Sequence, residues 1–152
     1  MGYVEELRSL VGHRPLILVA GVALIFDERE RLLLIERADD GHWGVTGGLM
    51  EPGETLEETT RREVREEVGL ELGELRSLGL FSGPSFHHVY PNGDESFGVT
   101  MASVARYDGA ELRLDPAEVL DARFFALDGL PAKLRSTVPI YVSRYLENGR
   151  RG

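Results

Sequence analysis

Residues 48–70 read GLMEPGETLEETTRREVREEVGL, the most informative local pattern of the chain. It starts as a loop with glycine and proline and continues as a helical pattern. Thr55 and Glu58 have the spacing of a capping box, and Gly69 is suited to end a helix in the left-handed conformation. The stretch therefore predicts a helix from about Leu56 to Val68.

The predicted helix places three carboxylates together. Glu63, Glu66 and Glu67 are spaced i, i+3 and i+4, so they share one side of the helix. Like charges this close repel one another unless a cation lies among them. Oxygen ligands of this kind suit Mg²⁺ or Mn²⁺ better than zinc. An acidic helix face of this kind is also common as a merely solvated surface.

The residues around the carboxylates favour the metal site over the solvated surface. Gly47 and Gly48 allow the backbone to approach a ligand closely, and the Pro52-Gly53 turn returns Glu54 towards the start of the helix. Arg62 is next to the carboxylates and is able to hold one of them through paired hydrogen bonds.

The stretch resembles the signature of the Nudix hydrolases, Gly-x5-Glu-x7-Arg-Glu-aliphatic-x-Glu-Glu-x-Gly-aliphatic. Every specified position is filled, by Gly48, Glu54, Arg62, Glu63, Val64, Glu66, Glu67, Gly69 and Leu70. The resemblance extends from about Leu16 to Pro131, although Thr46 stands where many family members have proline. It implies an α/β protein with the Nudix fold, an α/β/α sandwich with a mixed β-sheet.

The resemblance also implies an activity, that of a metal-dependent pyrophosphohydrolase. Such an enzyme cleaves a phosphoanhydride in a nucleoside diphosphate linked to another moiety, or in a (d)NTP, and releases a nucleoside monophosphate. We expect Glu63, Glu66 and Glu67 to hold Mg²⁺ or Mn²⁺ with the backbone carbonyl of Gly47 or Gly48. A non-catalytic nucleotide-binding module of the same fold is the alternative.

The general base stays open between Glu63, Glu67 and Glu118. Many Nudix enzymes place a further glutamate shortly before the aromatic residue of the last strand, and Glu118 lies six residues before Phe124. The other candidates for this position are Asp115, Asp121 and Glu95.

Three residues are candidates for contact with the substrate, namely Arg62, Trp43 and Phe86. Arg62 is better suited to hold the loop to the helix together with Glu54, and the two aromatic residues are better suited to the core than to stacking on a base. Pro84 follows Gly69 by 15 residues, a spacing that within the family often accompanies ADP-ribose hydrolysis. Gly83-Pro84 is also an ordinary turn sequence.

The chain of 152 residues suits a single domain, with residues 1–14 as an N-terminal helical extension. Tyr3 to Val11 form an amphipathic pattern that we expect to pack on the sheet or on a second subunit of a homodimer. There is no cysteine, which fits a reducing compartment. No long apolar run and no signal-peptide pattern occur, so we expect a soluble, cytoplasmic protein without a membrane partner.

The net charge of −9 disfavours nucleic acid as a partner, because an acidic surface repels the phosphate backbone. A small nucleotide-type substrate stays compatible, since metal ions and local arginines would neutralise its phosphates.

The remaining pattern predicts a mixed sheet covered by helices on both faces. Strands are predicted at residues 16–26, 32–37, 72–81, 86–90, 97–107 and 124–127. A closing helix is predicted at residues 136–148, and Gly149 is expected to end it. His87 and His88 are adjacent in a strand and face opposite sides, so they are not expected to bind one ion together. One of them is still able to face a phosphate.

Overall fold

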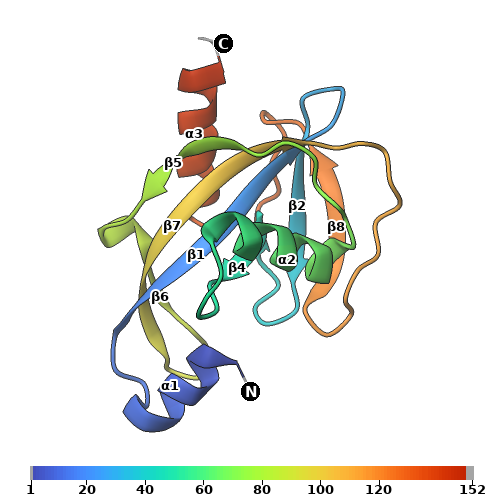
Figure 1. The fold of residues 1–152 in the computed structure, drawn as a ribbon. Coiled ribbons are helices and arrows are strands. Elements are labelled where there is room, and N and C mark those ends of the chain that lie inside the picture. The colour runs from blue at the N-terminus through green and yellow to red at the C-terminus, as the bar shows by residue number, and fades with distance from the viewer. Residues whose placement is uncertain (1, 150–152) are drawn as a thin grey trace.

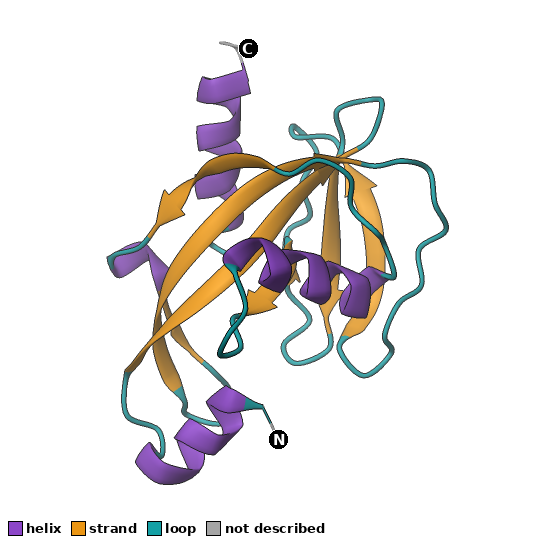
Figure 2. Ribbon diagram, viewed as in Figure 1, coloured by secondary structure: helices purple, strands orange, loops and turns teal. Residues whose placement is uncertain are grey.

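Strand β1 (Leu16–Phe26) alternates its buried side chains between two cores. In the computed structural model, which describes residues 2–149, Leu24 and Phe26 join one hydrophobic cluster, and Ala23 and Ile25 join the other. A sheet buried on both faces needs a cover on each. Helix α3 (Val138–Gly149) packs on the first cluster and helix α2 (Leu56–Val68) on the second, so the predicted α/β/α sandwich is confirmed (Figure 2).

The sheet is mixed, as predicted, because its two longest strands run parallel. β1 pairs with β7 (Glu95–Arg106) from Leu16 opposite Ser96 to Phe26 opposite Arg106, and the two strands cross the molecule side by side (Figure 1). The other strand pairs are antiparallel. β5 (Arg76–Phe81) and β6 (His87–Val89) pair with β7, while β3 (Trp43–Gly44) and β8 (Val119–Phe125) pair with β2 (Leu32–Arg37).

Strand β4 (Thr46–Leu49) pairs with a part of β1 that β2 does not pair with. β1 and β2 themselves pair at Phe26 opposite Leu32. Further along, β4 pairs antiparallel with β1, from Ala23 opposite Thr46 to Ala20 opposite Leu49. The result is a short glycine-containing strand that lies beneath α2.

Helix α2 has the predicted bounds and the predicted ends. The backbone N–H of Glu58 donates to the Thr55 hydroxyl at 3.1 Å, and the N–H of Thr55 donates to the Glu58 carboxylate at 3.0 Å. Gly69 ends the helix in the left-handed conformation with φ 72°. Val64 and Val68 are fully buried against the sheet, which fixes the rotation of the helix about its axis.

Several predicted bounds are wrong. β5 starts at Arg76 and not at Leu72, because the carbonyls of Leu72 and Gly73 accept hydrogen bonds from the Arg61 side chain instead of joining the sheet. The strand predicted at 124–127 is β8, which pairs with β2 already from Val119. Phe86 belongs to a short 3₁₀ helix, Pro84–Phe86, and not to the hairpin strand.

Two further bounds concern the closing helix and the N-terminal helix. α3 begins at Val138, two residues later than predicted, and the residues beyond Gly149 lie outside the described part of the chain. Helix α1 (Tyr3–Val11) has the predicted bounds and buries none of its residues. The Arg8 side chain connects α1 to the start of β7 by donating a hydrogen bond to the backbone carbonyl of Glu95 at 2.6 Å. Within residues 2–149 no helix has the length and apolar character that crossing a membrane requires.

Candidate active site

Glu67 is a buried carboxylate at the point where α2 lies over β4. Its side chain is 1% exposed. The N–H of Gly47 donates to one carboxylate oxygen at 2.8 Å, and Arg37 Nη1 lies 3.3 Å from the other. Burial raises the pKa of Glu67 to about 8, against the opposing effects of these two partners. A cation beside Glu67 would restore its ionised form.

Glu63 and Glu118 complete a cluster with Glu67. One carboxylate oxygen from each of the three lies within 4.8 Å of the others. Glu63 is one turn earlier on α2, and Glu118 directly precedes β8. Burial raises the pKa of Glu63, while the ion pair with Arg62 opposes this shift. Three converging carboxylates are hard oxygen donors, so these residues fit a divalent cation such as Mg²⁺ or Mn²⁺.

The two glycines of β4 allow this close packing. A Cβ on Gly48 would lie 2.4 Å from the carboxyl carbon of Glu63, closer than atoms of two side chains approach each other. Gly47 has φ 141°, and a Cβ there would lie 2.4 Å from the carbonyl oxygen of Gly21. Side chains at these positions would push β4 away from α2 and β1. Both glycines line the cleft, and metal ligation by their carbonyls stays a prediction.

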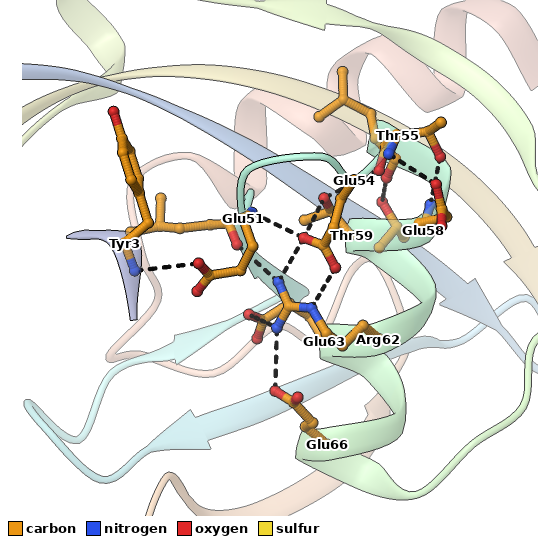
Figure 3. A network of polar contacts seen from close by, with 12 residues as sticks. Tyr3, Glu51, Glu54, Thr55, Glu58, Thr59, Arg62, Glu63 and Glu66 are labelled. Atoms are coloured by element: carbon orange, nitrogen blue, oxygen red, sulfur yellow. Dashed lines mark hydrogen bonds and ion pairs between the residues drawn. The ribbon is translucent and has the colours of Figure 1, made fainter. Parts of the chain in front are cut away.

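Arg62 and Glu54 hold the loop to the helix (Figure 3). The guanidinium donates to Glu54 at 2.6 and 3.0 Å, to Glu63 at 2.9 Å and to the carbonyl of Leu49 at 3.0 Å. The hydrogen bonds from Arg62 to Glu54 are the largest cause that holds the pKa of Glu54 down at about 2, and the hydrogen bonds to Glu54 and Glu63 raise the pKa of Arg62. This arrangement, which we call the Arg62 clamp, agrees with the structural role expected for Arg62 and Glu54. It uses most of the N–H donors of the Arg62 side chain.

Glu66 lies outside the carboxylate cluster. Its side chain is 51% exposed and accepts a hydrogen bond from Arg62 at 3.3 Å (Figure 3). The helical spacing placed three carboxylates on one side of α2, but packing on the sheet directs only Glu63 and Glu67 towards Glu118. Metal ligation by Glu66 stays a prediction.

The two aromatic candidates take part in the hydrophobic core. Trp43 is half-buried and meets Phe125 edge to face at 5.1 Å between ring centroids. Phe86 is buried and packs at 5.8 Å from Phe81 and 5.9 Å from Tyr141. The ring of Phe86 also lines a cavity beside the carboxylates.

The other carboxylates that compete with Glu118 are engaged elsewhere. Asp115 accepts a hydrogen bond from the N–H of Ala117, Asp121 pairs with Arg123 at 2.7 Å, and Glu95 pairs with His87 at 2.6 Å. None of these three belongs to the cluster that is found within residues 2–149.

The carboxylates line a cleft of about 450 Å³, which we call the catalytic cleft. A second cavity of about 590 Å³ adjoins it. The two share part of their lining, which consists of Ala20, Leu49, Tyr90, Arg135, Thr137 and Tyr141. A ligand that bridges both spaces is therefore sterically reasonable, and their volumes fall in the range of small-molecule sites.

Two arginines of this site were not predicted from the sequence. Arg37 ends β2 and reaches Glu67, and Arg135 lies between the two cavities. Both approach Asp39, at 3.8 and 3.4 Å. Arg37 had a weak signal, because it follows Glu36 at the charged end of an otherwise apolar strand. Arg135 had none, since its position depends on how the segment before α3 folds back onto β3.

Comparisons with known proteins agree with this architecture. The NUDIX domain family matches residues 15–145. The NAD-capped RNA hydrolase NudC of Chromobacterium violaceum is 34% identical over 116 residues, which are 74% of this chain and 40% of that protein. The protein of the same name from Vibrio vulnificus is 34% identical over 127 residues, or 83% of this chain and 44% of that protein.

A solved structure, the MutT NUDIX hydrolase from Burkholderia pseudomallei, superposes with a TM-score of 0.72 at 28% identity. The superposition covers 85% of this chain and 98% of that one. The chain spans less than half the length of the two curated relatives, so their likeness concerns one part of each.

Proposed function

This chain belongs to the NUDIX domain family, and from that premise we propose that it is a metal-dependent pyrophosphohydrolase. Its substrate is a nucleoside diphosphate linked to another moiety, or a (d)NTP, and one product is a nucleoside monophosphate. The observation that carries the proposal is the convergence of Glu63, Glu67 and Glu118 at the catalytic cleft, with their oxygens within 4.8 Å.

The three carboxylates would hold the metal, with the carbonyl of Gly47 or Gly48 as a further ligand. A divalent cation supplies Lewis-acid activation of water and neutralisation of phosphate charge when it is bound. The protein keeps the ligands in place before substrate arrives. The N–H of Gly47 and the Arg37 side chain fix Glu67, and Arg62 fixes Glu63.

The reaction also needs a group that accepts a proton. The oxygen of water bonds to one phosphorus, the bond from that phosphorus to the bridging oxygen breaks, and the water proton passes to a general base. Glu63, Glu67 and Glu118 all stay candidates for this role. Glu118 is the exposed member of the three, which allows it to return the proton to solvent.

The substrate class requires a direct assay. The names of the curated relatives refer to NAD-capped RNA, whereas the net charge of −9 disfavours a long nucleic acid. The panel therefore contains ADP-ribose, NADH, nucleotide sugars, diadenosine polyphosphates, (d)NTPs and NAD-capped RNA. Each is assayed for release of phosphate or nucleotide with Mg²⁺, with Mn²⁺ and with EDTA.

The variant that tests the site is Glu67→Gln, which keeps the shape of the side chain and removes its charge. We expect its turnover on the best substrate to fall at least about 100-fold while the melting temperature is kept. Glu57→Gln is the matched control, since that side chain lies on the same helix and is 64% exposed.

A folded Glu67→Gln protein with full activity would refute the metal site. Nucleotide binding without hydrolysis of any member of the panel would instead support the non-catalytic module. That module is the less favoured alternative, because the sequence retains every carboxylate of the signature.

A further inference from the structure

Arg135 lies in the lining that the catalytic cleft shares with the second cavity. Its Nη2 donates to Asp40 at 3.0 Å and to Asp39 at 3.4 Å. Its Nε is buried and has no hydrogen-bond partner among the described residues. The backbone fixes its place, because the N–H of Arg135 donates to the carbonyl of Trp43 at 2.8 Å. The guanidinium is thus anchored by one end and retains an unused donor.

The location of this donor suits a phosphate. A guanidinium binds phosphate through several N–H groups in one plane, and a buried N–H without an acceptor is costly until a ligand supplies one. Arg135 borders the cleft that holds the carboxylate cluster, so a phosphate beside it would be next to the reacting phosphate.

The second cavity itself suits an uncharged group. Its lining combines the rings of Phe86, Tyr90 and Tyr141 with the hydroxyls of Ser96 and Thr100. Among the described residues, Arg135 is the only lysine or arginine in the lining, and a phosphate at the border with the catalytic cleft would use it. A further phosphate in this cavity would have no free cation to balance it.

His88 provides a hydrogen-bonding group in the second cavity. Its ring meets Tyr90 edge to face at 4.2 Å, and its Nε2 is buried without a partner among the described residues. Burial lowers the pKa of His88, and the charge of Arg135 lowers it further. A neutral imidazole suits the hydroxyl or amide groups of a sugar or nucleoside.

We propose that Arg135 binds the phosphate next to the one that is hydrolysed, and that the second cavity holds the uncharged group attached to that phosphate. The inference rests on the proposed function and narrows it to diphosphates whose far end is a sugar or a nucleoside without a further phosphate.

Kinetics with ADP-ribose and Mg²⁺ test the role of Arg135. We expect Arg135→Ala to raise KM at least about tenfold and to leave kcat within about threefold, because the contact is present in both the ground state and the transition state. Arg123→Ala is the matched control, since Arg123 is 68% exposed on β8 and lines neither cavity. We expect no change in KM for this control.

Asp40→Asn separates substrate binding from a purely structural role. If Arg135 acts only by holding the loop of Asp39 and Asp40, this substitution breaks the same contact and should raise KM as much as Arg135→Ala does. If Arg135 binds phosphate, removal of a competing carboxylate leaves KM unchanged or lowers it. A common rise in KM for both variants would overturn the inference.

The outcomes separate this inference from the proposed function. An active wild-type protein with an unchanged KM in Arg135→Ala refutes the role of Arg135 alone. If the wild type does not hydrolyse ADP-ribose, calorimetry measures its binding, and a loss of affinity in Arg135→Ala supports the inference without catalysis. A wild-type protein that neither hydrolyses nor binds ADP-ribose overturns the inference.

Discussion

The catalytic cleft and the second cavity differ in how the chain builds them. Two of the three clustered carboxylates, both glycines and the Arg62 clamp come from residues 47–67. The second cavity collects residues from β1, from the loop at Asp40, from the β6 hairpin and from the segment before α3. We therefore expect substitutions in the catalytic cleft to change mainly kcat. Substitutions in the second cavity should change mainly the affinity for the substrate.

The largest effect is expected from Gly48→Ala. A Cβ at this position would lie 2.4 Å from the carboxyl carbon of Glu63, so the carboxylate must move. A displacement of about 1 Å at a catalytic group lowers turnover by about 100-fold. Gly73→Ala is the control, because a Cβ there meets nothing within 4 Å. Normal kcat in a folded Gly48→Ala protein would show that the position of Glu63 is not critical.

The next effect concerns the one cluster member that lies far from α2 in sequence. We expect Glu118→Gln to lower kcat at least about tenfold, because it removes either a metal ligand or the general base. Glu111→Gln serves as control, since Glu111 is exposed in the same loop. Unchanged turnover would show that the carboxylates of α2 are sufficient for the reaction. The catalytic groups would then all come from residues 47–67.

A third variant tests the stability of the locally encoded region. Glu54→Gln should lower the free energy of unfolding at pH 7 by about 1–3 kcal/mol, since it weakens hydrogen bonds to a charged partner. The pKa of Glu54 is about 2 in the folded protein against 4.5 ordinarily, so its stabilisation is complete above about pH 4.5 and is lost as the pH falls towards 2.

Denaturant unfolding of wild type and Glu54→Gln across this pH range checks the prediction. The difference between the two proteins should shrink as the pH falls. A difference that stays constant between pH 7 and pH 3 would show that the charge of Glu54 is not its source.

The smallest effect is expected in the second cavity. His88→Leu should raise KM for a sugar-linked diphosphate about 3- to 10-fold with kcat unchanged, as the loss of one neutral hydrogen bond predicts. Steady-state kinetics on ADP-ribose measure both constants. A fall in kcat with constant KM would contradict the division between a catalytic cleft and an affinity-determining cavity.

Much of the fold and part of the site were predictable from residue spacing. The bounds of α1, α2, β1 and β2 agree with the prediction, because periodicity and capping residues act within a few neighbours. The start of β8 was missed, since its pairing with β2 depends on residues far away in the chain. In the sequence, Asp121 and Arg123 interrupt the apolar residues before Phe124, although both belong to β8 in the structure.

Local sequence is sufficient for the family signature, for helix α2 and for the three carboxylates on one side of that helix. Tertiary structure decided which carboxylates converge. The packing of Val64 and Val68 on the sheet turns Glu63 and Glu67 towards Glu118 and leaves Glu66 exposed beside Arg62. It also placed Arg135 and His88 around the second cavity, because contacts between distant segments depend on the assembled sheet and not on local spacing.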